Sequence, residues 1–490
     1  MSKRRAPREL PSRARLLAAE RGAPITRGAH AVALLAPVPY ATAMSSLGFQ
    51  TVHRLLAELP ELCIERFFLP ETGESLLSFE SARSVHEFAL IAVSLAWENE
   101  LIGLMSCLQA AGIAPWAAER APDSPPILLG GPITYANPLA FAPFCDVMLM
   151  GEAEGLLERM LHAQLEAPDK ATWLARIGDW DGVYVPALHG ECLRPLNCAP
   201  DTALPARSLI YSPYAEFADM HLVELARGCS RRCAFCVMRR QTGRSMRVLS
   251  AERVLAAADV ELERVGLVGA AVSDHPQLLE VLEALLARGQ HCSLSSVRAD
   301  RVSEPLVALL RAGGARRLTV GVDGASQRLR DALFKGIRLS DIERCIDIAR
   351  SHAMALKFYL MIGVPGELDE DLSDFATWLA SAVRGTRSSL AVSPFVPKAH
   401  TPLEREGFAP AAELERRLGI LRKLLGGKVE LRATSVRWAR VEAAIAGAPW
   451  SLAERAWRAH CAGGSFAAWR DEVLTWSEQQ DPASRPWLES

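Results

Sequence analysis

Three cysteines, Cys229, Cys233 and Cys236, lie within eight residues of one another in the stretch VELARGCSRRCAFCVMRR (223–240). Their spacing is C-x3-C-x2-C, and no fourth Cys or His stands near enough to complete a tetrahedral zinc site. An iron–sulfide cube held by three thiolates leaves one iron open to a substrate or cofactor. The surrounding arginines favour thiolates and an anionic cluster. The stretch therefore predicts a 4Fe–4S centre with an open iron; a structural metal loop or reactive thiols are the alternatives.

The composition sets the class of protein and its compartment. The sequence has 490 residues, 50% of them hydrophobic and 23% charged, with a net charge of -2. These values are typical of a globular protein and give no general attraction for nucleic acid or for a membrane surface. No run of 18 apolar residues is present, so we expect no membrane span. Eleven cysteines without a regular pairing pattern predict a reducing compartment, the cytoplasm.

Residues 1–29 are rich in Lys and Arg and contain only two acidic residues, Glu9 and Glu20. No apolar segment follows the basic residues, so they do not form a secretory signal. We expect a solvated, disordered basic tail, with a transit peptide as the other interpretation.

Residues 30–164 alternate short apolar runs with segments of helical periodicity. Strands that alternate with helices favour a parallel sheet covered on both faces, so we predict a doubly wound, Rossmann-like α/β domain. Ligands of such sheets bind outside the carboxyl ends of the strands. There, Gly130 and Gly131 would let a bulky ligand approach the backbone; glycines of a tight turn are the structural alternative.

The rest of the chain divides into three parts. Residues 165–220 are rich in Pro, Gly and Asp and predict a linker with a small hairpin around GVYVPALHG (182–190). Residues 221–405 hold six strand-like stretches separated by amphipathic helices, which favours a partial (β/α)6 TIM-like barrel with its chemistry at the carboxyl ends of the strands. Residues 406–490 are predicted to be a helical C-terminal region whose recurring tryptophans pack in a core.

The motif CSRRCAFC, followed by six βα units, resembles the radical SAM enzymes. The resemblance implies that Cys229, Cys233 and Cys236 hold a 4Fe–4S cluster whose open iron chelates the amine and carboxylate of S-adenosylmethionine. One electron would then cleave this cofactor and release a 5′-deoxyadenosyl radical or its organometallic equivalent. A reductant such as flavodoxin or ferredoxin would supply the electron. Phe235, which precedes the last cysteine, would lie against the adenine.

The resemblance extends over about residues 30–405 to a subgroup with an N-terminal cobalamin-binding-like domain. It rests on the order along the chain of SSLGFQTVHRLL, LGGPITYANPLAF, GEAEG, GVYVP, SSVRADR, LKFYLMIGVPGELDED and SPFVPKAHTP. Many cobalamin domains use Asp-x-His-x-x-Gly to ligate cobalt, and residues 30–160 contain no such motif. Two interpretations of the missing motif remain: the domain binds a corrinoid without a protein imidazole, or it has lost the cofactor.

The resemblance also suggests contacts to S-adenosylmethionine at the strand ends. Gly269 would lie near the methionine amine, although the family's Glu is missing there. Ser296 and Arg298 suit the cofactor carboxylate or ribose; a helix-start cap and a surface Arg are the alternative. Asp323 stands where the family places a ribose-binding Glu. His400, near Lys398 after the sixth strand, is interpreted as a structural group rather than a catalytic one.

Three functions remain open at this point. With a corrinoid, the resemblance implies a radical SAM methyltransferase that acts at carbon or phosphorus; without one, it implies rearrangement, thiolation or decarboxylation. The second possibility is a 4Fe–4S electron-transfer or scaffold protein that does not cleave S-adenosylmethionine. The third is a tRNA-modifying radical SAM enzyme, which the mixed charges after residue 405 do not favour. Nucleic acid is therefore not an expected partner.

Overall fold

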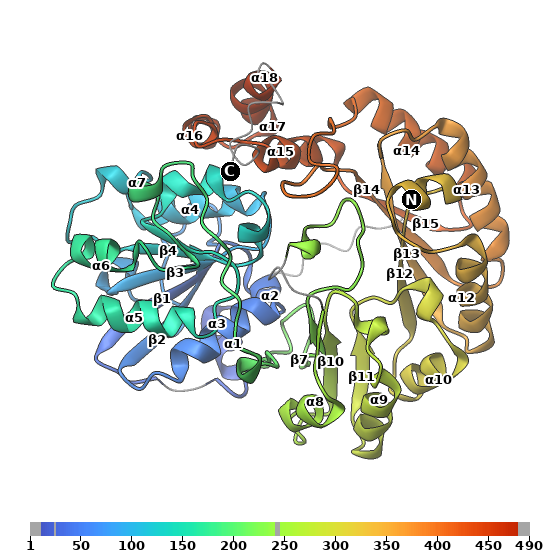
Figure 1. The fold of residues 1–490 in the computed structure, drawn as a ribbon, viewed down its shortest axis with the longest axis horizontal. Helices are drawn as coiled ribbons and strands as arrows, with labels where there is room; N and C mark the ends of the chain where they lie inside the picture. The colour runs from blue at the N-terminus through green and yellow to red at the C-terminus, as the bar shows by residue number, and fades with distance from the viewer. Residues whose placement is uncertain (1–10, 24–25, 241–245, 479–490) are drawn as a thin grey trace.

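Short apolar runs in this sequence form two groups of largely parallel strands with helices between them (Figure 1). The computed structural model describes residues 11–23, 26–240 and 246–478. The predicted α/β class with parallel sheets is confirmed. Within the described ranges, no helix combines the length and the apolar character that a membrane crossing requires.

The first group of strands is a six-stranded sheet with the order β2-β1-β3-β4-β5-β6. The first five strands pair in parallel, and β6 pairs antiparallel with β5. Apolar residues fill these strands, and residues 32–36 are all buried because both faces of the sheet are covered. The strands are β1 (His30–Ala36), β2 (Leu62–Phe68), β3 (Leu90–Ser94), β4 (Ile127–Gly130), β5 (Val147–Leu149) and β6 (Val183–Tyr184).

Helices cover both faces of this sheet (Figure 1). One face packs against α3 (Leu47–Ala57), α5 (Leu156–Glu166) and α6 (Lys170–Ile177). The other packs against α4 (Glu100–Ala111) and the C-terminal α16 (Leu452–Cys461). Helix α3 begins where the Ser46 hydroxyl accepts a hydrogen bond from the Phe49 N–H. Helix α4 ends at Gly112, which adopts the left-handed conformation that glycine tolerates.

The second group of strands contains two parallel sheets, β11-β10-β7 and β12-β13-β14-β15. A parallel bridge between Val297 and Val320 lies between them. A short antiparallel pair, β8 with β9, brackets the cysteine stretch. The strands are β7 (His221–Glu224), β8 (Ala226–Arg227), β9 (Arg247–Val248), β10 (Arg264–Val268), β11 (His291–Leu294), β12 (Arg317–Asp323), β13 (Ala355–Ile362), β14 (Ser388–Pro394) and β15 (Glu430–Ala433).

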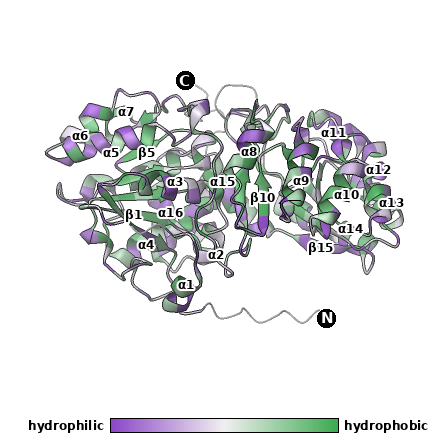
Figure 2. Cartoon of the chain, turned by 90° about the horizontal axis from the view of Figure 1, so that it is seen from below, coloured by the Kyte–Doolittle hydropathy of each residue, from purple (hydrophilic) through white to green (hydrophobic). Residues whose placement is uncertain are grey.

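Helices pack on the outer side of these strands (Figure 1). In β12 and β13 buried residues alternate with more exposed ones, so one side joins the core beneath the helices and the other is partly open. Figure 2 shows β10 as mainly hydrophobic and the outer helices as mixed. The helices are α8 (Ala251–Ala257), α9 (Leu278–Ala287), α10 (Glu304–Ala312), α11 (Gln327–Ala332), α12 (Leu339–Ser351), α13 (Asp369–Ala382) and α14 (Ala411–Leu425).

The C-terminal helices α16, α17 (Phe466–Trp469) and α18 (Thr475–Ser477) pack on the core of the first sheet. Helix α15 (Val436–Ala446) lies between the two groups of strands (Figure 1): Val441 and Ile445 join the core of the first sheet, and Val436 joins that of the second group. Trp469 is fully buried, and the Trp457 ring lies against Trp116 and Phe144. The Asn137 amide donates to the carbonyls of Ala446 and Ala448. The expectation that tryptophans of this region pack in a core is confirmed for Trp457 and Trp469.

The structure corrects three details of the predicted organisation. Part of the predicted disordered tail forms α1 (Arg13–Ala19), because Leu16 is buried and nearby Glu20 pairs with buried Arg66; residues 1–10 lie outside the described residues. The predicted hairpin is wrong: β6 pairs with β5, and α7 (Pro186–His189) follows, because Pro is favoured at the first helical position. The predicted helical region after residue 406 also contributes the strand β15.

Candidate cluster and cofactor site

The three cysteines lie on the segment between β8 and β9, after the carboxyl end of β7. Gly228, with φ of 81°, turns the chain out of β8. The Ala234 N–H donates to the Leu333 carbonyl over 2.9 Å, which fixes the middle of the cysteine segment to the turn after α11. The Cys229 sulfur accepts a hydrogen bond from the Arg231 N–H at 3.4 Å. All three thiols are free.

The surroundings of these thiols suit an anionic cluster. Burial raises the pKa of Cys233 and raises that of Cys236 to about 11. The positive charge of Lys335 lowers both pKa values in part. Ligation to iron deprotonates a buried thiol, and cationic neighbours support the resulting charge. Within the described residues, no three His, Cys, Asp or Glu side chains are grouped to hold a single metal ion. This finding is compatible with a cube, whose thiolates bind separate irons.

Asp323 lies beside this segment and is paired with a residue that the sequence analysis did not identify. The Lys335 ammonium is 2.5 Å from the Asp323 carboxylate. Asp323 has a φ of 63°, an uncommon conformation that short polar residues tolerate better than most. Lys335 follows the turn that contacts the cysteine segment. For this reason both residues affect the pKa of Cys233: Lys335 lowers it and Asp323 raises it.

The other predicted S-adenosylmethionine contacts differ in their surroundings. Arg298 is buried, so the alternative of a surface Arg is wrong. Its guanidinium donates to Asp300 and to the carbonyls of Lys335 and Gly336, so it supports the turn that carries Lys335. Ser296 is exposed at the end of β11. Phe235 is half-buried and packs against the core of the second group of strands.

A cavity of about 610 Å³ lies between the carboxyl ends of the first sheet and the start of the cysteine segment. It brings together Gly130, Gly131 and Gly269, which the sequence analysis placed at two different cofactors. A side chain at Gly131 would collide with the Leu95 carbonyl, so the close approach to this backbone requires a glycine at position 131. A Cβ at Gly130 would meet only ordinary contacts. The other lining residues are mostly aliphatic, with Glu100, Glu152, Glu154, Glu224 and Arg227 as the charged ones.

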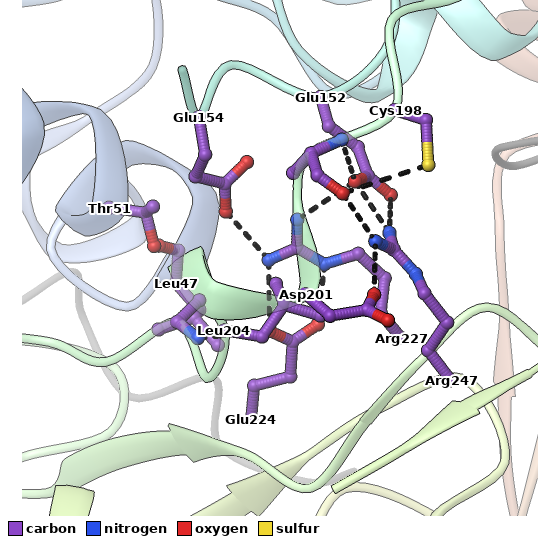
Figure 3. A network of polar contacts seen from close by, with 12 residues as sticks. Leu47, Thr51, Glu152, Glu154, Cys198, Asp201, Leu204, Glu224, Arg227 and Arg247 are labelled. Carbon is purple, nitrogen blue, oxygen red and sulfur yellow. Dashed lines mark hydrogen bonds and ion pairs between the residues drawn. The ribbon is translucent and has the colours of Figure 1, made fainter.

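Arg227 is the centre of a buried ion-pair network at this cavity (Figure 3). Its guanidinium is 2.7 Å from Glu224, 2.8 Å from Glu154 and 3.3 Å from Glu152. Burial lowers the pKa of Arg227, but Glu224 and Glu154 raise it more, so the net shift is upward. Arg247 on β9 also contacts Glu152, at 2.5 Å. The network therefore joins the loop after β5 to both strands that bracket the cysteines.

Glu100 contributes a carboxyl to the cavity wall that forms no ion pair with the described residues. It is 9% exposed, accepts a hydrogen bond from the Ala96 N–H, and has a pKa raised to about 7, chiefly by burial. A raised folded-state pKa gives stability that is complete below the unfolded-state value near 4.5 and lost as the pH rises through about 7.

We therefore expect Glu100→Gln to gain about 3 kcal/mol of unfolding free energy relative to the unsubstituted protein between pH 4.5 and pH 8. Denaturant titrations of both proteins across this range measure the difference, and the exposed Glu119→Gln controls for removal of one carboxylate. A difference that does not change with pH would show that Glu100 titrates in the folded protein as it does in the unfolded chain.

Two family models match successive parts of the chain: radical SAM proteins, N-terminal, over residues 48–186, and the radical SAM superfamily over residues 223–379. Together they cover more than half of the sequence. The chain therefore belongs to the radical SAM superfamily, as the motif CSRRCAFC predicted. Enzymes of this superfamily use a 4Fe–4S cluster and S-adenosylmethionine, so the assignment of these two cofactors follows from membership.

The chain is also similar to other proteins in sequence and in fold. An uncharacterized protein of Methanocaldococcus jannaschii is 27% identical over 388 residues, which are 77% of this chain and 80% of the relative. The ribosomal protein uS12 methylthiotransferase RimO of Syntrophobacter fumaroxidans is 29% identical over 178 residues, 31% of this chain and 40% of the relative. The structure of the radical S-adenosylmethionine methyltransferase TsrM from Kitasatospora setae, with cobalamin and a 4Fe–4S cluster bound, has a TM-score of 0.59 at 13% identity. That match covers 92% of this chain and 99% of TsrM, which shows a shared fold.

Proposed function

We propose that this protein is a cobalamin-dependent radical SAM methyltransferase. The observation that carries the proposal is the cavity between the first sheet and the cysteine segment. Its volume of about 610 Å³ and its mainly aliphatic wall suit part of a large cofactor with apolar faces. Its place outside the carboxyl ends of parallel strands is where ligands of such sheets bind. The full-length likeness to a fold that binds cobalamin in TsrM supports the same conclusion.

In this proposal the domains keep the predicted bounds. Residues 30–164 form the Rossmann-like, cobalamin-binding-like domain, residues 165–220 the linker, residues 221–405 the partial (β/α)6 barrel, and residues 406–490 a largely helical C-terminal region. The Arg227 network then has a defined role, because it ties the loop after β5 to the base of the cysteine segment. It holds the two proposed cofactor sites in a fixed relation.

The residues around the cysteine segment would hold the other cofactors. Cys229, Cys233 and Cys236 would ligate the cluster, and Phe235, Gly269, Ser296 and Asp323 would line the S-adenosylmethionine site, with Arg298 and Lys335 positioning its edge. When bound, the cluster supplies an electron for cofactor cleavage and the corrinoid supplies a transferable methyl group. No His lines the described part of the cavity, so the protein would hold a corrinoid without an imidazole ligand. A flavodoxin- or ferredoxin-like reductant would deliver the electron.

The proposal predicts a stoichiometric corrinoid that depends on the cavity. We expect protein produced with cobalamin supplied to retain about one corrinoid per chain, measured by absorbance and mass. In Gly130→Leu a side chain would enter the cavity, and we expect corrinoid content to fall about tenfold with iron content unchanged. Gly419→Leu is the matched control, because its added side chain meets open space on α14. Retention of corrinoid in Gly130→Leu, or no corrinoid in the unsubstituted protein, would contradict the proposal.

A further inference from the structure

Two oppositely charged residues, Arg231 and Asp274, form a pair directly beside the cysteine segment. Arg231 stands between Cys229 and Cys233, and Asp274 ends a short turn that follows β10. The Arg231 guanidinium donates two hydrogen bonds to the Asp274 carboxylate, from Nε and Nη2, each over 2.7 Å. Paired N–H···O bonds of this kind combine strength with a defined geometry. The pair therefore fixes Arg231 and, with it, the chain between the first two cysteines.

Asp274 is itself held in place and is charged. Its side chain is 5% exposed, its backbone N–H donates to the Ala271 carbonyl, and Arg301 contacts its carboxylate at 3.0 Å. Burial raises the pKa of Asp274, but Arg231 and other nearby arginines lower it more, so the net shift is downward. A buried carboxylate needs such cationic partners, because water no longer compensates its charge. Asp274 is thus a fixed anchor for Arg231.

Further contacts connect this anchor with the second point at which the cysteine segment is held. Arg231 also lies 3.8 Å from Asp300, after β11, and the Asp300 carboxylate accepts a hydrogen bond from Arg298 at 2.9 Å. Arg298 in turn donates to two carbonyls of the turn formed by residues 333–336. The first carbonyl of the same turn accepts the hydrogen bond from the Ala234 N–H. The contacts form a closed path that leaves the segment at Arg231 and returns to it at Ala234.

Arg231 also contacts a cysteine directly. Its backbone N–H donates to the Cys229 sulfur at 3.4 Å. Hydrogen bonds to Asp274 raise the pKa of Arg231 most, and the charge of Cys229 raises it further, so the guanidinium and this sulfur interact electrostatically. Hydrogen bonds to the sulfurs and the nearby charge are two of the factors that set the reduction potential of an iron–sulfur cluster. Arg231 is thus placed to affect both the shape of the segment and the charge beside the cluster.

We propose that Arg231 and Asp274 are positioning residues for the 4Fe–4S cluster: Asp274 holds the segment between the first two cysteines in the shape that binds the cluster, and Arg231 keeps a positive charge beside it. This inference rests on the proposed function for the assignment of Cys229, Cys233 and Cys236 as ligands. Because the protein alone makes the contacts that hold Arg231, the segment keeps this shape before iron is bound. The pair lowers the cost of ordering the segment and influences the potential at which the cluster accepts its electron.

The first measurement is made on the full-length protein before a cluster is added. Hydrogen–deuterium exchange, measured by mass spectrometry on peptides from residues 228–236, reports how well the segment is ordered. Asp274→Asn keeps the size of the side chain and removes its charge, and we expect exchange in these peptides to become about tenfold faster. Arg232→Gln removes an exposed positive charge from the same segment and should leave exchange unchanged. Unchanged exchange in both Asp274→Asn and Arg231→Gln would overturn the proposal.

The second measurement is the midpoint reduction potential of the reconstituted cluster, followed by electron paramagnetic resonance. Reduction adds one negative charge to the cluster, so Arg231→Gln, which removes a positive charge, should shift the potential downward. Asp274→Asn removes a negative charge and should shift the potential upward. Arg231→Lys keeps the charge, should keep the potential, and serves if Arg231→Gln does not fold. Shifts in the same direction for Arg231→Gln and Asp274→Asn would show loss of order alone and overturn the role given to the charge.

The two measurements separate this inference from the proposed function. Protein that takes up no iron after anaerobic reconstitution would refute the proposed cluster ligands and this inference together. Full iron content, with exchange and potentials unchanged in the variants, would refute this inference alone. Neither measurement involves a corrinoid, so absence of corrinoid would contradict the proposed methyltransferase and leave the result for Arg231 and Asp274 standing.

Discussion

Cys233→Ala is expected to lose nearly all of its bound iron and all cleavage of S-adenosylmethionine. Cys233 is the most buried of the three cysteines and is placed by the hydrogen bond between Ala234 and Leu333. A cube held by three thiolates has no spare protein ligand, so one missing corner leaves the cluster without sufficient support. Iron and sulfide analysis after anaerobic reconstitution measures the loss, with about four irons per chain expected for the unsubstituted protein.

Cys192→Ala is the matched control for this substitution. Cys192 is an exposed free thiol in the linker, far along the chain from the cysteine segment. Its replacement should leave iron content and cofactor cleavage unchanged. A Cys233→Ala protein that retained a full cube and full cleavage would show that the ligands have been assigned incorrectly.

Arg227→Met is expected to destabilise the protein by about 3–5 kcal/mol, because it leaves Glu152, Glu154 and Glu224 buried around an apolar side chain. All three carboxylates are less than 10% exposed. Arg247 still contacts Glu152, so the cost falls mainly on Glu154 and Glu224. We also expect lower cluster occupancy, since Arg227 immediately precedes the turn into the cysteine segment.

Thermal unfolding compared with Arg301→Met separates this effect from the loss of any arginine. Arg301 is about half exposed in its ion pair with Asp274, and a pair of this kind contributes about 1 kcal/mol or less. Equal stability of the two variants would contradict the assignment of Arg227 as the charge centre of the buried network.

The features that the sequence predicted well are local ones. The spacing of Cys229, Cys233 and Cys236 spans eight residues and needed no knowledge of the fold. The strands were predictable because buried parallel strands such as β3 are continuous apolar runs. Local propensity failed in the linker, where β6 gains its structure by pairing with β5 and not with a neighbouring strand.

The features that the sequence did not reveal depend on contacts between distant residues. Glu154 and Arg227 are 73 positions apart, and Glu152 and Arg247 are 95 apart, so no motif links them. The sequence analysis used GEAEG for the resemblance and VELARGC for its first cysteine; that Glu152, Glu154 and Arg227 form ion pairs could be seen only in the folded chain. His400 was interpreted as a structural histidine, and its unpartnered Nε2 could be seen only in the folded chain.

Cofactor cleavage tests the central claim most directly. Anaerobically reconstituted protein is incubated with S-adenosylmethionine and dithionite, and 5′-deoxyadenosine is quantified by mass spectrometry against a reaction without reductant. The assignment to the radical SAM enzymes, with a cluster held by the three cysteines, predicts that 5′-deoxyadenosine accumulates only when the reductant is present. Protein that carries a full complement of iron and sulfide and yet forms none would contradict it and favour an electron-transfer or scaffold role for the cluster.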